Sequence, residues 1–440
     1  MNTPNNQTTS RRDFLKTSAI IGGALAAPAI LPGKLFADNN SDTLKIGLIG
    51  CGGRGSGAAT QALNADKNVA LWAMGDAFED RLQDSLKNLK ADADVGDKVK
   101  VTPERCFVGL DAYQKVIDSG VDVVLLTTPP GFRPMHLKAA VAAGKHIFCE
   151  KPVAVDAPGV RSVLASAEEA KRKKLSLLSG FCYRYSKGER EMYKRVHDGE
   201  IGDVTSVYSS YITSPVWVKP RQAGWTDMQA QVRNWYYYAW LSGDHIVEQA
   251  VHNLNKMQWA MNDVTPLRAI GIGGRQVRTG PEFGHIYDHF GVVYDYPNGV
   301  KGIHFCRQWE NCANEGLDWG TGTKGSFKVV PFQSQEIKVT GGNTWHNLFK
   351  NQKNMYQVEH DEFFASIRSG NPMNDGKMMA ESTMVAIMGR MAAYTGEIVT
   401  WEQAMNSQEV LAPANAPAMI ESDVKLEEPP VAIPGKTKLA

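Results

Sequence analysis

The chain has 440 residues, of which 43% are hydrophobic and 22% are charged, and its formal net charge is +1. This composition is typical of a globular protein of two or three domains, and the absence of a basic excess argues against nucleic acid as a partner. The six cysteines form no C-x-x-C pair, and no Cys/His group has zinc-ligand spacing, so we expect no metal site.

The first 37 residues are typical of an export signal. Arg11 and Arg12 lie in the stretch SRRDFLK, and an apolar run rich in Gly and Ala follows. That run is too short for a membrane span, which takes ~20 apolar residues. Paired arginines before such a run resemble the twin-arginine signal of bacteria, with cleavage expected after Ala37. The sequence therefore predicts a mature periplasmic protein that is exported folded and has no membrane span.

A glycine-rich turn then predicts a dinucleotide-binding site. The apolar run KIGLIG predicts a buried parallel strand, SGAATQAL predicts a helix, and Gly50-x-Gly52-x-x-Gly55 lies between them. In this context Gly50 permits the tight turn, Gly52 lets the backbone approach a pyrophosphate, and Gly55 lets the helix pack closely on the strand. The helix N-terminus adds free N–H groups and a partial positive charge for the phosphates.

The second strand, NVALWAMGD, ends at Asp76. An acid about 20 residues after the glycine motif is placed to accept the ribose hydroxyls, and its charge would repel a 2′-phosphate. We therefore expect NAD as the cofactor in preference to NADP, although Arg81 nearby weakens that preference.

Strand and helix patterns continue to alternate up to the motif E-K-P. AYQKVIDSG and PMHLKAAVAAG predict helices, whereas VDVVLLTTPP and KHIFCEKP predict strands. Such alternation predicts a doubly wound parallel sheet, whose ligand lies at the carboxyl ends of the strands. The predicted cofactor-binding residues combine the glycine-rich turn with these strand ends: Gly50, Gly52, Gly53, Arg54, Gly55, Asp76, Thr127, Pro129, His136, Glu150 and Lys151.

The second half of the chain contains mostly strand patterns. VTSVYSSYI and GTKGSFKVV each predict a strand, and residues 285–309 predict a β-hairpin that turns at Pro297-Asn298-Gly299. Residues 354–370 and 377–396 predict helices that return to pack on the first domain. The predicted fold class is thus α/β, with a Rossmann doubly wound parallel sheet followed by an α+β domain with an open, mostly antiparallel sheet.

The predicted domain organisation follows these patterns. It comprises a signal peptide at 1–37, a Rossmann domain at 44–155, a substrate and oligomerisation domain at 156–355, helices at 356–408 and a Pro-rich extended tail at 409–440. The tail either wraps a neighbouring subunit or is loose.

The stretch GDHIVEQAVHNLN, residues 243–255, combines acids and histidines with an apolar face. On a single helix, one side would carry a stripe formed by Asp244, Glu248, His252 and Asn255. Such a stripe is either a solvated surface or the wall of a site. Asp244 is interpreted as the N-cap of this helix.

Five aromatic residues precede this stretch in RNWYYYAWLSG. Trp and Tyr rings stack well on the C–H faces of sugars. Core packing explains any one of these rings more simply. As a cluster beside the acid–His stripe, however, Trp235, Tyr236 and Trp240 are candidate substrate contacts.

GLIGCGGRG, TTPPGFRPMHLKAAVAAGKHIFCEKPVA and EQAVHNLN together resemble the Gfo/Idh/MocA oxidoreductases, the glucose–fructose oxidoreductase and inositol dehydrogenase family. The resemblance covers residues 44–408. It implies a sugar, polyol or glycoside substrate and a homodimer or homotetramer built on the free face of the second sheet. It also implies Lys151 as the catalytic lysine, Glu248 and His252 as the D-x-x-x-H pair, and Arg184 as a substrate contact. Glu248 departs from the Asp that is usual in the family.

These residues suit the oxidation of a secondary alcohol. His252 is the expected base, Glu248 is expected to orient its ring, and Lys151 is expected to hold the substrate oxygen. Because the periplasm has no working NAD pool, we expect a retained cofactor that returns its hydride within the same protein. Two alternatives stay open: a redox-neutral NAD-dependent glycosidase or epimerase that uses a transient keto-sugar, and a non-catalytic nucleotide- or sugar-binding homologue.

Overall fold

The computed structural model describes residues 42–348, 350 and 352–439. The predicted export signal, with Arg11 and Arg12, lies outside these residues. Among the helices of the described part, none combines the length and the apolar composition of a membrane span.

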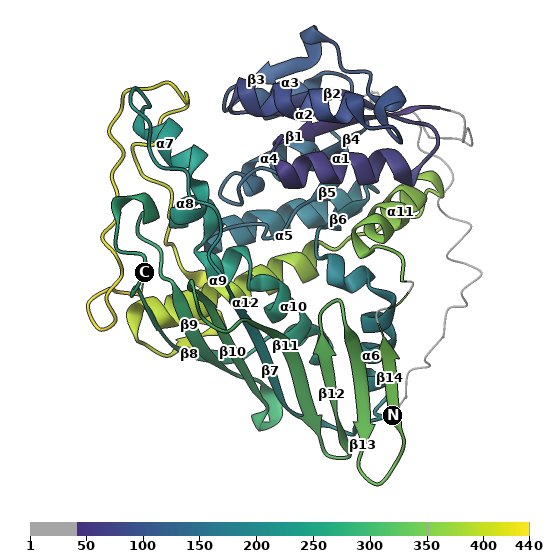
Figure 1. Cartoon of the computed structure of the whole chain (residues 1–440), viewed down its shortest axis with the longest axis vertical. Helices are drawn as coiled ribbons and strands as arrows, with labels where there is room; N and C mark the ends of the chain where they lie inside the picture. Colours follow the sequence, from purple (N-terminus) through teal and green to yellow (C-terminus); the bar gives the residue numbers. More distant parts are fainter. Residues whose placement is uncertain (1–41, 349, 351, 440) are drawn as a thin grey trace, which may run out of the picture. The chain divides into compact units, whose positions relative to one another are not determined.

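The first sheet is parallel throughout (Figure 1). Its strand order is β3-β2-β1-β4-β5-β6, with β1 (Leu44–Ile49), β2 (Val69–Asp76), β3 (Cys106–Val108), β4 (Val123–Leu126), β5 (His146–Cys149) and β6 (Leu177–Ser179). The strand order reverses between β1 and β4, and ligands of such sheets bind at this switch point. The helices between these strands are α1 (Gly53–Ala65), α2 (Glu79–Ala91), α3 (Ala112–Asp118), α4 (Arg133–Ala142) and α5 (Ala157–Arg172).

This parallel sheet confirms the predicted Rossmann architecture but extends beyond the predicted boundary at residue 155. Helix α5 packs on α4, and β6 pairs with β5. The E-K-P motif therefore follows the fifth strand of the sheet and does not close the domain.

The second sheet is mixed and mostly antiparallel, as predicted. Its order is β14-β13-β12-β11-β7-β10-β9-β8-β15, and β7 and β10 form its parallel pair. The strands are β7 (Val204–Thr213), β8 (Arg268–Gly274), β9 (His289–Asp295), β10 (Lys301–Gln308), β11 (Glu315–Gly322), β12 (Gly325–Val330), β13 (Ser334–Val339), β14 (Thr344–Leu348) and β15 (Val399–Thr400). Strands β9 and β10 form the predicted hairpin, with Asn298 and Gly299 in left-handed conformations at its turn.

Helices cover one face of this sheet. They are α6 (Lys187–His197), α10 (Val251–Ala260) and α12 (Gly376–Thr395), which contact β13, β7 and β8 respectively. The exposed apolar side chains of Ile270, Ile272 and Phe305 belong to β8 and β10. They alternate with buried residues, so they lie on the opposite, free face. The predicted homodimer or homotetramer stays a prediction, for which this face is the natural candidate.

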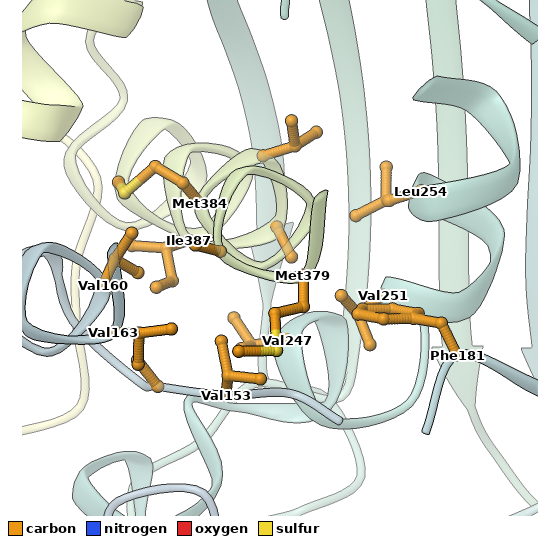
Figure 2. Close-up of a cluster of buried hydrophobic side chains, with 14 of the residues drawn as sticks. Val153, Val160, Val163, Phe181, Val247, Val251, Leu254, Met379, Met384 and Ile387 are labelled. Carbon is orange, nitrogen blue, oxygen red and sulfur yellow. The ribbon is translucent and has the colours of Figure 1, made fainter. Parts of the chain in front are cut away.

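Helix α12 joins the two sheets into one core, as Figure 2 shows. Its residues Met379 and Ile387 lie between Val160 and Val163 of α5 on one side and Val247 and Val251 on the other. Helix α11 (Met355–Arg368) packs on α1. Helix α11 thus contacts the Rossmann domain, whereas α12 contacts α5, which lies beyond the predicted domain boundary at residue 155; the predicted domain division stays a prediction.

Within the described residues, the tail after residue 408 contains no helix or strand and lies along its own chain (Figure 1). Thr226 Oγ1 donates to the carbonyl of Ile420, and the Leu426 amide donates to Asp227. Both apolar tail residues are buried. The tail therefore fastens the segment that contains α7 (Asp227–Arg233).

Candidate active site

A cavity of about 720 Å³ lies at the carboxyl ends of the parallel strands, a size that is usual for small-molecule and cofactor sites. Every predicted cofactor residue contributes to its lining, as do Lys151, Glu248 and His252. The second domain closes the other side with Tyr211, Trp217, Lys219, Val232, Arg233, Trp235 and Gln249. The structure thus brings together in one cavity residues from as far apart in the chain as Ile49 and Tyr356.

The glycine-rich turn has the shape that a dinucleotide needs. Gly50 has φ +97°, and a Cβ on Gly55 would lie 1.9 Å from the Gly50 carbonyl oxygen, so neither position admits a side chain without strain. A Cβ on Gly52 or Gly53 would instead meet nothing within 4 Å. The turn is therefore closed on the protein side and open on the cavity side, where α1 begins and presents its N–H groups.

Asp76 has two tasks at the end of β2. Its carboxylate accepts hydrogen bonds from the backbone N–H of Cys51 (2.6 Å) and of Phe78 (2.9 Å), which fixes the glycine-rich turn to β2. Burial raises its pKa, and these two N–H donors oppose that shift. Each carboxylate oxygen can accept a second hydrogen bond, so the side chain can also receive ribose hydroxyls in the cavity that it lines.

Glu150 is a buried acid that contributes to the cavity lining. Its Oε1 lies 3.1 Å from Arg54 Nε, and its Oε2 accepts from the Lys151 backbone N–H at 3.1 Å. A Cβ on Gly180 would lie 2.6 Å from Oε2, so only glycine after β6 leaves room for this carboxylate. Glu150 therefore fixes both the glycine-rich turn and the backbone that carries Lys151.

Lys151 reaches across to the second domain. Its Nζ donates to the backbone carbonyl of Glu248 at 2.6 Å and to the Glu248 carboxylate at 3.3 Å. Both side chains are largely buried, with 13% and 12% of their surface exposed. This hydrogen-bonded ion pair places the Lys151 amino group at the cavity wall.

The prediction of one continuous helix at residues 243–255 is wrong. Helix α9 (His245–Glu248) ends before α10 begins at Val251. Asp244 has φ +72° and is fully buried, and it caps α9 as predicted while accepting from Tyr287 N–H and Tyr394 Oη. Asn255 is also buried, where it donates to Ser382 Oγ. Glu248 and His252 alone of the predicted stripe reach the cavity.

His252 is held by rings and not by a carboxylate. Its ring packs edgewise on Phe181 and Tyr183, with centroid distances of 6.1 and 5.3 Å. Its Nδ1 is buried and has no hydrogen-bond partner among the described residues. Burial, and then the charges of Lys151 and Lys256, hold its pKa well below the ordinary value. Glu248 bonds to Lys151, so the expectation that it orients the imidazole is not met.

Three of the predicted substrate contacts lie outside the cavity lining, and Trp235 lies within it. Tyr236 is buried and accepts from Gln308, and Trp240 is buried and donates to Gln231. Arg184 is bound to Asp263 and Asn255. Core packing explains the two aromatic residues, and a local ion pair explains the arginine.

In the second domain, several cavity residues that the sequence did not reveal come from the stretch after β7. Trp217 and Lys219 follow that strand in an irregular segment without periodicity or motif. Tyr211 lies on β7 itself, where strand alternation predicted the strand but not its cavity neighbours. Tertiary packing brings these side chains to the site, and no local sequence signal indicates their position.

Comparison with known proteins agrees with this geometry. Residues 44–177 match the profile of the family GFO_IDH_MocA, described as an oxidoreductase family with an NAD-binding Rossmann fold. This part of the chain is thus similar to the NAD-binding Rossmann domain of that oxidoreductase family. The glycine-rich turn, open toward the cavity, fits the pyrophosphate of NAD, the dinucleotide in the family's description.

Curated proteins that are similar to this chain carry the names of different enzymes. The 2,7-anhydro-N-acetylneuraminate hydratase of Escherichia coli K12 is 25% identical over 52% of this chain and 56% of its own length. The inositol 2-dehydrogenase of Serratia proteamaculans is 26% identical over 50% and 55%. The chain therefore spans about half the length of the curated relatives it matches. A levoglucosan dehydrogenase solved with NADH and levoglucosan shares the fold over 82% of this chain and 99% of its own, with a TM-score of 0.65 and 16% identity.

We predict that Asp76 determines the preference for NAD. In Asp76→Ala the charge that opposes a 2′-phosphate is lost while Arg81 remains, so the ratio of NADP to NAD dissociation constants should fall about tenfold, which corresponds to ~1.4 kcal/mol. Titration calorimetry with both cofactors measures this ratio. Asp84→Ala, which changes an exposed acid of α2, the helix that carries Arg81, is the control and should leave this ratio unchanged. A wild-type protein that prefers NADP would contradict the assignment.

Proposed function

We propose that the chain is an NAD-dependent oxidoreductase that removes hydride from a secondary alcohol of a sugar, polyol or glycoside. One observation carries the proposal: Lys151 from the first domain and Glu248 and His252 from the second line the same cavity as the glycine-rich turn. The names of the relatives, an inositol dehydrogenase and a levoglucosan dehydrogenase, support this substrate class.

The bound nicotinamide would supply the hydride acceptor, and the chain supplies the proton chemistry. His252 takes the hydroxyl proton, because a lowered pKa leaves its imidazole neutral at ordinary pH. A base of low pKa needs an acidified alcohol. The Lys151 ammonium provides this by stabilising the negative charge that develops on the substrate oxygen. Glu248 holds Lys151 through its carbonyl and its carboxylate.

The acid–base assignment predicts a graded series of variants. His252→Ala and Lys151→Ala should each slow the reduction of bound NAD in a single turnover by about 10²-fold or more. Glu248→Gln should be milder, because the backbone carbonyl and one side-chain oxygen still accept from Lys151. NADH absorbance after mixing with sugar measures the rate.

The control for this series is His346→Ala, which changes an exposed histidine on β14. It should keep the wild-type rate. A His252→Ala protein with near-normal single-turnover reduction would show that the base lies elsewhere.

We further propose that the cofactor is retained between turnovers. Arg233 of α7 binds Asp80 through two hydrogen bonds of 2.9 and 3.0 Å, and its guanidinium lies 3.9 Å from the Phe78 ring. Phe78 and Asp80 both lie in the short stretch that follows Asp76 in the chain. Helix α7 is in turn fastened by the tail, where Gln231 donates to Glu428 at 2.8 Å. The second domain is thereby bound across the ribose end of the cavity.

Retention predicts faster release when this fastening is cut. Arg233→Ala should increase the rate of NAD dissociation about 3- to 10-fold, since a partly exposed ion pair and two cation–π contacts, to Phe78 and Trp225, are lost. Asp80→Ala should act likewise, and the double variant should add little to either single variant. Loss of bound NAD on rapid dilution measures the rate. Arg221→Ala, which cuts a contact to Asp227 remote from Asp80, is the control; equal rates in all variants would exclude the fastening.

We also propose export by the twin-arginine route, which rests on the stretch SRRDFLK alone. Exchange of Arg11 and Arg12 for Lys should keep the precursor in the cytoplasm, as cell fractionation would show. Unchanged export of that variant would disprove this proposal.

A redox-neutral reaction is the second candidate, and the retained cofactor favours it. The name of the Escherichia coli relative, a hydratase, describes a reaction without net oxidation. In such a reaction hydride returns to the same sugar, so NADH would appear transiently and the product would have the oxidation state of the substrate. Product analysis after many turnovers without added acceptor separates the two candidates.

A further inference from the structure

A fully buried ion pair lies behind the candidate base. Lys256 and Asp318 are bonded to each other, with 0% and 1% of their side chains exposed. Lys256 lies one helical turn after His252 on α10, and Asp318 lies on β11. Neither residue lines the cavity. A buried ion pair is weak evidence of stabilisation, because apolar residues of similar volume often serve the fold equally well.

Tyr183 connects this pair to His252. It belongs to η3 (Cys182–Tyr185), and Lys256 Nζ lies 4.5 Å from its ring centroid. The same ring meets the His252 ring at 5.3 Å and 81°. One tyrosine is thus fixed on its face by the ammonium and packs edgewise on the imidazole. Since the imidazole Nδ1 has no hydrogen-bond partner among the described residues, this packing is a main restraint on the ring.

Lys256 and Asp318 have different polar and charged neighbours. Asp318 also accepts from Asn253 at 2.9 Å. Burial raises the pKa of Glu189, the other acid facing Lys256, to about 7, so this carboxyl is partly protonated near neutral pH. Burial lowers the pKa of Lys256, but Asp318 and Glu189 outweigh this effect and raise it. Lys256 therefore stays cationic.

The groups that face His252 come from four elements. They are Lys151 after β5, Glu248 on α9, Tyr183 on η3 and Lys256 on α10. Around the pair itself, α6 adds Glu189 and Tyr193 and η3 adds Cys182. Glu248 is engaged by Lys151, so both cations disfavour protonation of the imidazole.

We propose that Lys256 and Asp318 are a positioning pair for His252: they fix Tyr183 against the imidazole and place a positive charge behind it, so that the ring enters the reaction as a neutral base. The inference rests on the proposed role of His252. It adds that a charge outside the cavity sets the pH range in which this role is possible.

The test removes both charges together. Lys256→Met with Asp318→Asn keeps the chain lengths and the acceptor for Asn253. Loss of Lys256 removes the charge that lowers the pKa of Glu189, so this buried carboxyl becomes more fully protonated and needs no cationic partner. Carbon-13 NMR of labelled histidines follows His252, whose signal is assigned by its loss in His252→Ala. The titration midpoint of His252 should rise by about one pH unit or more. Lys256→Gln with Asp318→Asn replaces the pair by two amides and serves if the first variant does not fold.

Activity gives a second readout. Above its midpoint the imidazole is neutral and active, so the acidic limb of single-turnover NAD reduction should move to higher pH by the same amount as the midpoint. This makes reduction about tenfold slower at a fixed pH on that limb, while NAD affinity is unchanged. Lys256→Arg retains the charge and should keep the midpoint within a few tenths of a unit.

The matched control is Arg190→Met with Glu362→Gln. This ion pair, at 2.6 Å, also stacks on a tyrosine of η3, Tyr185, but it does not face His252. It should leave the midpoint unchanged. An unchanged midpoint in the Lys256→Met/Asp318→Asn protein would overturn the inference. Normal single-turnover reduction by His252→Ala would instead overturn the proposed function, so the two failures are distinguishable.

Discussion

The candidate site depends on one contact between the two domains, from the Lys151 amino group to the carbonyl and carboxylate of Glu248. Each half alone has an incomplete candidate site: the Rossmann sheet has a lysine and a glycine-rich turn but no candidate base, and the second domain has the candidate base His252 but no such turn. The lysine is the group that both halves share. Because Glu248 supplies a backbone oxygen as well as a carboxylate, the contact depends on the position of α9 as much as on its side chain.

The position of α9 is fixed by packing and not by polar contacts alone. Val153, directly after the E-K-P motif, and Val247, directly before Glu248, belong to the same buried cluster (Figure 2). Met379 of α12 lies beside them. A dense apolar core responds to the loss of a single methylene, so it transmits small displacements to the site above it. Substitutions in this cluster would therefore alter the distance between Lys151 and His252 without touching either residue.

The parts of this site that the sequence predicted are those that local rules govern. The glycine-rich turn, Asp76 and Lys151 lie at strand ends whose order follows from alternation alone. The helix break after Glu248 was not predictable, because the apolar period continues across it and the left-handed Asp244 has no marker besides the preceding glycine. Tyr236 and Trp240 were misassigned because an aromatic ring in a cluster has the same sequence signal in a core as in a sugar site. Trp217 and Lys219 needed the tertiary structure.

The burial of Tyr236 and Trp240 contributes to the fold around the site. Together with Ile420 and Leu426 of the tail they form a small apolar cluster that also includes Phe78 of the first domain. This cluster packs the segment after β7 against Phe78 of the first domain and against the tail. Arg233 and Trp235, which are next to this cluster in the chain, line the cavity. Preorganised side chains lose little conformational freedom on binding, so the free energy of their contacts with a ligand is kept for affinity and orientation. The tail, far from the candidate site in sequence, thereby contributes to the geometry of that site.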